Sequence, residues 1–413
     1  MSSQLRSDAE KIYTYAIQCS LPDTAVKNCL TSMELPGNIV VISVGKAAWT
    51  MASAALEVLG DRIKSGLVLT KYDHSRGALG NLEIIEAGHP ILDKNSFRGT
   101  KRALELTGSL TPEDTVLFLL SGGGSALFEL SELDIAELQD INSQLIGSGA
   151  SIQEINTVRK RLSLVKGGRF AKHCAPAKVV GLLLSDVMGN QPDMIASGPV
   201  CADASTCAQA LQIVEKYKIQ LSEKAKELLQ VETPKELPDV TCHICGDVRQ
   251  LCEAAAEECQ RLEYTPIILT SELCCEAKEA GSFLASVAKS HANDRKKLAY
   301  IAGGETVVHL TGKGLGGRNQ ELALAAAEGI LGLSNVAIFS VGSDGTDGPT
   351  DAAGGYVDGF TKKQLATCGI QISDVLVEND AYHALEQCGG LIKTGATGTN
   401  INDVAVVLIA KSK

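Results

Sequence analysis

Short apolar runs alternate with segments of helical periodicity almost from one end of the chain to the other. The runs are rich in branched aliphatic residues, which is typical of strands that are buried on both faces. Helical segments between such strands favour largely parallel sheets with helices on both sides. The pattern predicts an α/β protein, with strands at residues 39–44, 66–70, 83–87, 116–120, 179–184, 240–244, 266–270, 298–301, 306–310, 336–341 and 404–409.

A polar segment with two prolines, residues 230–239, follows a charged helical segment at Ser222–Leu229. The 413 residues are too many for one ordinary hydrophobic core. We therefore predict two α/β domains, a Rossmann-like N-terminal domain at 1–235 and a C-terminal domain at 236–413. Because ligands of parallel sheets bind beyond the carboxyl ends of the strands, the chemistry is expected in the loops that follow the apolar runs.

The formal net charge of −11 comes without a Lys/Arg cluster, which argues against binding to nucleic acid or to an anionic membrane. No apolar run is long enough to span a membrane, and the N-terminus lacks signal-peptide character. We expect a cytoplasmic protein with a small-molecule partner, and both an organellar copy and the choice between monomer and homo-oligomer stay open. The 13 scattered cysteines, Cys242-x-x-Cys245 included, indicate reduced packing residues rather than a metal site.

A glycine-rich turn, residues 312–317, lies between a predicted strand and a predicted helix at 319–331. Its glycines match G-x-G-x-x-G, but the acidic residue of a dinucleotide site is missing from the required place in a compact βαβ unit. Arg318 stands in the first helical turn, where the helix dipole disfavours a cation by about 0.3 to 1 kcal/mol. We expect a compensating anion at this turn, held with help from Gly316, Gly317 and Asn319.

Two further loops are candidate anion sites. Lys46 is a second cation at the start of a helix, although no Walker A glycine precedes it, and a solvated lysine is the alternative interpretation. A strand at 116–120 leads into a turn of three glycines between two hydroxyls, whose amides suit phosphate or carboxylate. This turn comprises Ser121, Gly122, Gly123, Gly124 and Ser125, and a flexible hairpin is the alternative interpretation. His89, at the end of another strand, is expected to be structural.

Acidic and amide side chains follow the strands in both halves. Asp186, directly after the strand at 179–184, is a candidate magnesium ligand or general base, or alternatively a helix cap. Glu305 ends another strand. The loop at 343–355 is rich in oxygen ligands and suits magnesium or sugar-like hydroxyl groups, although solvated turn aspartates explain part of its composition. Another loop of small residues, at 394–403, precedes the last strand, and the candidate binding residues are Glu305, Asp344, Asp351 and Asn400.

A capping box formed by Ser151 and Glu154 predicts the start of a helix that carries several basic residues. One polar face of this helix suits the lining of a cleft. Most of its charges are expected to be solvated, namely those of Arg159, Lys160 and Arg161, together with the following Lys166.

Together, two helix-start cations, a glycine turn and carboxylates in both halves suit phosphoryl transfer in an interdomain cleft. That reaction needs cations for the phosphoryl oxygens and a carboxylate for the attacking hydroxyl. Two other classes stay open. The glycine fingerprint suits a nicotinamide-dependent hydroxy-acid dehydrogenase, and the serine–glycine loops suit a non-catalytic regulator that binds phosphosugars.

The order of motifs strongly resembles the glycerate 2-kinase family, also called class II glycerate kinases or MOFRL proteins. The resemblance covers nearly the whole chain and rests on VGKAA (44–48), GHPILDKNS (88–96), SGGGSAL (121–127), INTVRKRLSLVKGG (155–168), LSDVMGN (184–190), IASGPV (195–200), GGETVVHLTGKGLGGRNQELAL (303–324), SDGTDGPTDAAGG (343–355) and TGTNINDV (397–404).

This resemblance implies two α/β domains with the active site between them, the second being of MOFRL type. It also implies ATP- and Mg²⁺-dependent phosphorylation of D-glycerate to 2-phosphoglycerate. Lys46 and Arg318 match positions of catalytic importance in the family. The turn from Ser121 to Ser125 would hold either the nucleotide phosphates or the glycerate carboxylate.

Overall fold

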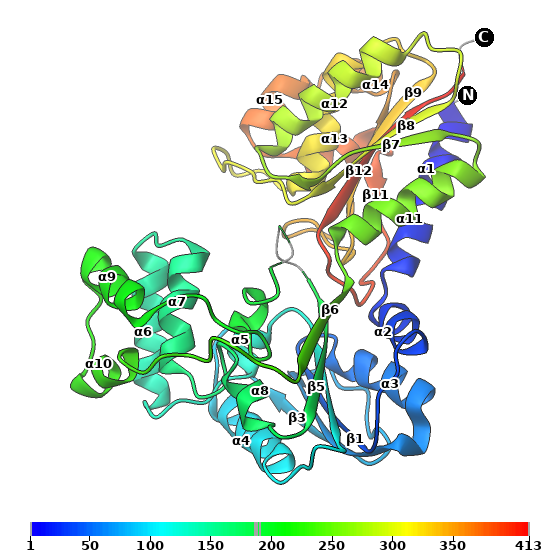
Figure 1. Ribbon diagram of the computed structural model, residues 1–413. Coiled ribbons are helices and arrows are strands. Elements are labelled where there is room, and N and C mark those ends of the chain that lie inside the picture. Colours follow the sequence, from blue (N-terminus) through cyan, green and yellow to red (C-terminus); the bar gives the residue numbers. More distant parts are fainter. Residues whose placement is uncertain (1, 186–188, 190, 412–413) are drawn as a thin grey trace. The chain divides into compact units, whose positions relative to one another are not determined.

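The computed structural model describes residues 2–185, 189 and 191–411, which form two compact α/β units (Figure 1). One unit is Pro22–Cys245, and we call it the N-terminal unit. The other, the C-terminal unit, combines the residues through Leu21 with those from Gly246 onward. No helix in the described part of the chain is long and apolar enough to cross a membrane.

The N-terminal unit is built on a six-stranded sheet with the order β3-β2-β1-β4-β5-β6. Its first five strands pair in parallel, as predicted. Val44 at the end of β1 is in register with Leu120 at the end of β4, so the loops that follow these two strands begin next to each other. The strands are β1 (Ile39–Val44), β2 (Ile63–Lys71), β3 (Leu82–Ala87), β4 (Thr115–Leu120), β5 (Lys178–Leu184) and β6 (Val240–Gly246).

Alternate residues of these strands enter two separate cores, one on each face of the sheet. In β4, Phe118 and Leu120 pack with Phe170, whereas Leu117 and Leu119 pack with Met51 on the other face. The helices of the unit are α2 (Pro22–Thr31), α3 (Ala48–Leu59), α4 (Lys94–Thr107), α5 (Gly124–Leu127), α6 (Ile135–Gly147), α7 (Ile152–Leu162), α8 (Arg169–His173), α9 (Cys207–Tyr217) and α10 (Glu223–Leu229), with 3-10 turns η1 (Gly60–Arg62) and η2 (Ile195–Ser197).

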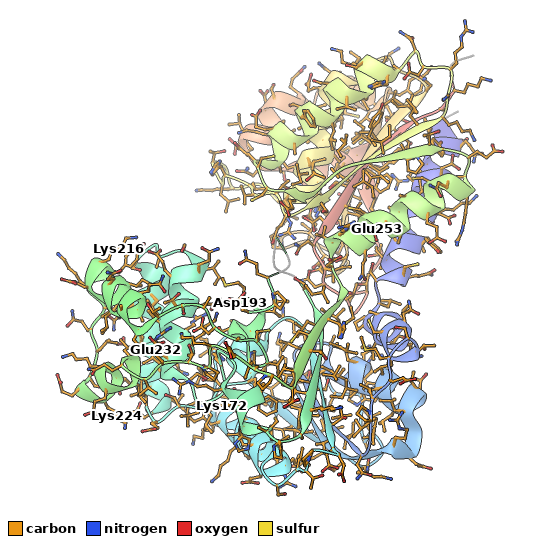
Figure 2. The ribbon with its side chains drawn as sticks, viewed as in Figure 1. Lys172, Asp193, Lys216, Lys224, Glu232 and Glu253 are labelled. Carbon is orange, nitrogen blue, oxygen red and sulfur yellow. The ribbon has the colours of Figure 1, made fainter. Side chains whose placement is uncertain are left out.

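Helices α6, α7, α9 and α10 form a lobe beside the sheet with a third core of its own (Figure 1). Surface ion pairs join its segments: Lys216 of α9 contacts Glu154 of α7 at 2.8 Å, and Lys224 of α10 contacts Glu132 in the loop before α6 at 2.5 Å. Figure 2 shows both lysines on this lobe. Because these pairs are exposed, each contributes at most about 1 kcal/mol, and the apolar core holds the lobe together.

The predicted capping box at Ser151 and Glu154 is confirmed, but the expected solvation of the basic residues around α7 is wrong. Lys160 and Arg161 are buried and share the carboxylate of Asp203. Lys166 is fully buried, and its ammonium lies 3.0 Å from Glu129, which is also buried. A buried charge persists only when it is paired and hydrogen-bonded. These basic residues are therefore structural.

Lys166 also supports the turn that follows β4. Its ammonium donates to the backbone carbonyls of Ser125 at 3.0 Å and Phe128 at 2.8 Å. Burial lowers the pKa of Lys166, and the charge of Glu129 opposes that effect. One buried cation thus fixes the backbone at the end of the serine–glycine turn.

The Lys166→Met substitution is expected to lower the free energy of unfolding by about 3 to 5 kcal/mol, because it leaves the buried Glu129 carboxylate without its cation. Urea denaturation measures this loss. Lys172→Met is the matched control, since Lys172 is exposed (Figure 2) and should change stability by no more than about 0.5 kcal/mol. Equal stability of the two variants would contradict the assigned role of Lys166.

The sheet of the C-terminal unit has the order β11-β10-β9-β12-β8-β7. Only β7 and β8 pair in parallel, and the other four neighbouring pairs are antiparallel. The expectation of a largely parallel sheet is therefore wrong for this unit, because an apolar run reports burial of both faces and not strand direction. The strands are β7 (Thr265–Leu273), β8 (Leu298–Gly304), β9 (Val336–Gly342), β10 (Gly354–Asp358), β11 (Leu391–Ile392) and β12 (Asp403–Ile409).

One predicted strand of this unit is absent, and two strands that it does contain were not predicted. Residues 306–310 form no strand and make a single bridge, between Val307 and Glu276. Strands β10 and β11 were not predicted because they are short and glycine-flanked. The helices of the unit are α1 (Ser2–Cys19), α11 (Val248–Arg261), α12 (Ala277–His291), α13 (Arg318–Gly329), α14 (Thr361–Thr367), α15 (Ile372–Val377) and α16 (Ala381–Gln387).

The unit boundaries differ from the predicted division at residue 235 because α1 packs beside α11 on the C-terminal sheet (Figure 1). Its apolar face, including Leu5 and Ile12, joins the core around Phe339. The proline-containing segment at 230–239 is part of the N-terminal unit, where the backbone carbonyl of Pro234 accepts from the amide of Asp203 at 3.0 Å. That segment connects two elements of one unit and is not a linker.

Candidate functional site

The loops after β1 and β4 are joined by hydrogen bonds. The amide of Lys46 donates to the carbonyl of Gly122 at 2.9 Å, and the amide of Ala47 donates to the Ser121 hydroxyl at 3.0 Å. Gly45 has φ 120°, and a Cβ atom there would lie 2.2 Å from Ser121 Oγ. The close approach therefore requires glycine. The Ser121 side chain is buried and structural, which differs from its expected role in binding ligand.

Lys46 and His89 flank the turn between Ser121 and Ser125. A Cβ atom on Gly123 would lie 3.4 Å from Lys46 Cγ and 3.0 Å from His89 Cδ2. Burial, followed by the charge of Lys46, lowers the pKa of His89, which favours the neutral imidazole. The Lys46 side chain is exposed, and no carboxylate among the described residues pairs with its ammonium. This cation is thus available to an anionic ligand next to Gly123.

The rest of this turn is held by packing. Gly124 is buried, and a Cβ atom there would lie 2.7 Å from Leu120 Cδ1 and 2.8 Å from Ala196 Cβ. Gly122 and Ser125 are each tied through a backbone carbonyl, to the Lys46 amide and to the Lys166 ammonium respectively. The turn is therefore a rigid element and not a flexible hairpin.

Arg318, the first residue of α13, is already paired within the protein. Its Nε and Nη2 atoms donate to the two carboxylate oxygens of Asp403 at 2.5 and 3.1 Å, and Nη1 donates to Glu305 at 2.9 Å. Burial alone would lower the pKa of the guanidinium, but hydrogen bonding and the charge of Asp403 outweigh it and raise the pKa. The expected compensating anion is thus supplied by side chains, and not by a ligand in the glycine turn.

Backbone amides of the glycine-rich turn donate hydrogen bonds to other residues of the protein. Gly312 donates to the Asn379 side chain at 2.9 Å, Gly314 donates to the Glu378 carbonyl at 2.8 Å, and Leu315 donates to the Asp380 carboxylate at 2.9 Å. A Cβ atom on Gly312 would lie 2.3 Å from the Glu378 backbone. The glycines allow this close contact with the segment between α15 and α16. Such packing, and not a dinucleotide, explains the G-x-G-x-x-G spacing.

Asp347 caps α13. Its two carboxylate oxygens accept from the amide of Asn319 at 3.1 Å and the amide of Gln320 at 2.9 Å. A Cβ atom on Gly317, the residue just before α13, would lie 2.3 Å from the Asp347 side chain, so this position must be glycine. Burial raises the pKa of Asp347 to about 6, against the lowering effect of these amides. Asp347 was not predicted, and the only signal for it was its place in an acidic loop after a strand.

Three loops meet at one edge of the C-terminal sheet. Asp403, the first residue of β12, is in register with Gly304 at the end of β8 and with Gly342 at the end of β9. Glu305 follows the first glycine, and Asp344 lies just beyond the second. The Oδ1 atoms of Asp344 and Asp403 each lie 3.4 Å from the position of a Cβ atom on Gly342. The sheet thus gathers carboxylates around Arg318.

Other predicted residues of this unit have different environments. Asn319 is buried and accepts from the Ser340 hydroxyl at 2.6 Å, so it serves packing. Asp351 is exposed and bound to Lys393 at 2.9 Å and to the Tyr382 hydroxyl at 2.8 Å. Asn400 is exposed, and Gly316 packs against Ala381.

The predicted magnesium ligand Asp186 lies outside the described residues. In the part of the chain that the structure describes, no three His, Cys, Asp or Glu side chains are arranged to hold a metal ion. Cys242 and Cys245 contribute to cores on opposite faces of the N-terminal sheet, which excludes the pair as ligands of one metal. This confirms the packing interpretation of that motif.

Known proteins resemble the chain over its full length. Two family models match it, one described as a domain of unknown function (DUF4147) at residues 8–230 and one described as the MOFRL family at residues 298–403. A D-glycerate 2-kinase of Thermotoga maritima is 51% identical and covers 98% of both chains. The chain belongs to the glycerate 2-kinase family.

A crystal structure from this family supports the fold. The glycerate kinase of Thermotoga maritima superimposes with a TM-score of 0.96 at 50% identity, covering 99% of this chain and 100% of that one. A further relative, from Agrobacterium vitis, is 37% identical over 98% of this chain and 94% of its own, and carries the provisional name hydroxypyruvate reductase.

Asp347 is expected to make stability depend on pH. Its folded pKa of about 6 exceeds the ordinary value of 3.8, so its contribution is complete below about pH 4 and is lost as the pH rises through 6. A two-unit shift corresponds to a loss on the order of 3 kcal/mol. In chemical denaturation, the stability of the native protein relative to Asp347→Asn should fall by that amount between pH 4 and pH 7.

The exposed Asp351 provides the control for this experiment. Its pKa is lowered, first by the hydrogen bond from Lys393, so the native protein should show no comparable decline relative to Asp351→Asn. A constant stability difference between native protein and Asp347→Asn across this pH range would show that Asp347 does not titrate there.

Proposed function

We propose that the protein transfers a phosphoryl group from ATP to the 2-hydroxyl of D-glycerate in a magnesium-dependent reaction. The observation that carries this proposal is the full-length similarity to a D-glycerate 2-kinase, at 51% identity. The two clusters around Lys46 and Arg318 support it, because each brings a cation to the strand ends of an α/β sheet. The location of the active site between the domains stays a prediction.

Lys46 is suited to neutralise a phosphoryl or carboxylate group. Its side chain is exposed, its Cγ atom lies beside Gly123, and its backbone is fixed by the hydrogen bond from the Lys46 amide to Gly122. The fixed backbone keeps the base of this flexible side chain next to the turn, so its ammonium can reach negative charge that develops on a transferring group. Phosphoryl transfer depends largely on this kind of positioning and electrostatic stabilisation.

Arg318 is suited to hold an oxyanion in a fixed orientation. A guanidinium has five N–H groups, and within the described residues three of them are used by Asp403 and Glu305. The two that remain can donate to a carboxylate or phosphoryl oxygen, and the side chain is 34% exposed. Asp403 and Glu305 therefore orient the Arg318 guanidinium before a ligand binds.

The carboxylates fit a magnesium ion that arrives with a nucleotide. Mg²⁺ commonly binds through one or two carboxylates together with substrate phosphates and water, so a cage of three protein ligands is not required. Asp344 is partly exposed at the ends of the strands, and its Oδ1 atom accepts from the Thr346 amide of its own loop. We propose Asp344 as a ligand, and a role of Asp186 in binding magnesium stays a prediction from the sequence. When bound, magnesium neutralises charge on the phosphate oxygens.

The dehydrogenase alternative rested on the glycine fingerprint. The structure gives those glycines a packing role, because the amides of Gly312 and Gly314 are bound to residues 379 and 378 and Gly317 packs against Asp347; the motif therefore no longer favours a nicotinamide cofactor. The provisional reductase name of the Agrobacterium vitis relative still makes the assay worthwhile. A non-catalytic regulator is distinguished by the absence of turnover.

Phosphorus NMR of the protein with ATP, magnesium and D-glycerate should show 2-phosphoglycerate. Lys46→Ala and Arg318→Ala should each slow its formation about 100- to 1,000-fold, because each removes a charge from the reacting groups. Lys172→Ala, at an exposed lysine of the N-terminal unit, is the control.

Formation of 3-phosphoglycerate would overturn the regiochemistry. No product from folded protein would reject the kinase, and a separate assay with NADH and hydroxypyruvate then tests the reductase.

Asp403→Asn is expected to lower kcat about 100-fold while the fold persists. The substitution replaces one of the two carboxylate oxygens that orient Arg318, and a small displacement of the guanidinium lowers the reaction rate strongly. Steady-state kinetics below the melting temperature, with circular dichroism as the check on folding, measures this effect. Glu328→Gln is the control, because Glu328 lies near the far end of the same helix and pairs with Lys362. An unchanged kcat would show that Asp403 does not position Arg318 for the reaction.

A further inference from the structure

Two cysteines that the proposed kinase reaction does not use lie in contact in the N-terminal unit. The sulfur atoms of Cys201 and Cys242 are 3.7 Å apart. Cys242 belongs to β6, the edge strand of the sheet, and Cys201 follows the 3-10 turn η2. The two residues are distant in sequence, so only the fold brings these thiols together.

The backbone around the pair leaves room for the sulfurs. Gly181 lies on the neighbouring strand β5, and a Cβ atom there would be 3.2 Å from Cys242 Sγ and 3.1 Å from a Val200 methyl group. The absent side chain makes the space in which the Cys242 sulfur sits. The Cys242 thiol also donates to the carbonyl of Val200 at 3.2 Å, which holds it toward the segment that carries Cys201.

Small molecules can reach the pair. Both residues are partly exposed, and both line an open groove of about 520 Å³. Pro192 and Asp193 form another part of its wall; Figure 2 labels Asp193, which pairs with Lys160 at 3.0 Å. A reactive cysteine needs solvent access, which the fully buried thiols of this unit, such as Cys174, lack.

We propose that Cys201 and Cys242 are a modification site, at which hydrogen peroxide converts the two thiols to an intramolecular disulfide. Thiols in contact need only a small movement to reach bonding distance. The Cys242 thiol is the attacking group. Its pKa is lowered chiefly by the hydrogen bond with Cys201, in opposition to burial, whereas the pKa of Cys201 is raised.

The reaction balances in two steps. The Cys242 thiolate attacks one peroxide oxygen, so an S–O bond forms, the O–O bond breaks, and the leaving hydroxide takes the thiol proton to become water. The Cys201 sulfur then attacks the resulting sulfenic acid; the S–S bond forms, the S–O bond breaks, and the second water leaves with the Cys201 proton. Two thiols and one peroxide thus yield one disulfide and two waters, with two electrons passing from sulfur to oxygen.

The bond would tie the edge strand of the sheet to the segment that precedes α9. The loop it closes contains α9, α10 and the proline-containing segment at 230–239. Closing a loop of this kind restricts the unfolded chain, so the oxidised protein should melt several degrees higher than the reduced protein. The modification is independent of the proposed kinase reaction.

The test uses the full-length protein with equimolar hydrogen peroxide. After oxidation, remaining thiols are blocked with N-ethylmaleimide, and the protein is digested without reductant for mass spectrometry. We expect a cross-linked peptide pair that contains Cys201 and Cys242, is lighter by two hydrogens, and separates on treatment with dithiothreitol. The rise in melting temperature should disappear with the cross-link.

Substitutions separate this pair from other thiols. Cys201→Ser should abolish the cross-link and leave Cys242 as a sulfenic acid that dimedone traps. Cys207→Ser, at a nearby cysteine of similar exposure, should leave the cross-link intact. The Cys29–Cys245 pair is the internal competitor, because a hydrogen bond from Cys245 lowers the pKa of Cys29 to about 7.

Two results would overturn the proposal. One is a cross-link between Cys29 and Cys245 in place of the expected pair. The other is oxidation confined to the exposed cysteines while Cys201 and Cys242 both remain open to alkylation; the exposed residues are Cys274, Cys275 and Cys368.

Discussion

The paired hydrogen bonds between Arg318 and Asp403 are the constraint on which the C-terminal cluster depends. They join the first residue of α13 to the first residue of β12. A guanidinium at the start of a helix opposes the helix dipole, and a carboxylate placed against it removes that conflict. The bidentate geometry also fixes the plane of the guanidinium, which a lysine at this position would not achieve. Charge balance and orientation therefore come from one contact.

A second carboxylate supports the same helix start from the other side. Asp347 accepts the free amides of the first turn of α13, and in doing so it holds the loop after β9 against Gly317. Burial raises the pKa of both Asp347 and Asp403, and this effect is opposed by the helix amides at Asp347 and by the Arg318 guanidinium at Asp403. This balance makes the cluster sensitive to any group that adds or removes charge.

The two cations to which the proposed function assigns a role, one in each unit, have different environments. Arg318 is enclosed by carboxylates, whereas Lys46 is exposed beside a rigid turn and has no carboxylate partner in the described chain. Arginine suits the position among carboxylates because its guanidinium has enough N–H donors to bind protein and ligand groups at the same time. Lysine suits the second role because a compact ammonium can follow a moving phosphate group. The family resemblance marked both residues, and the structure distinguishes what each is prepared to do.

Local sequence alone determined the strand positions of the N-terminal sheet, the capping box at Ser151, and the two helices that begin near Lys46 and Arg318, because these depend on periodicity and backbone chemistry over a few residues. Tertiary structure decided what depends on distant partners. It set the antiparallel direction of β12, the packing of α1 on the C-terminal unit, and the burial of Lys166 against Glu129. Asp403 and Asp347 gained their roles in the same way, since a carboxylate becomes a cap or an ion-pair partner only when the fold brings a helix start to it.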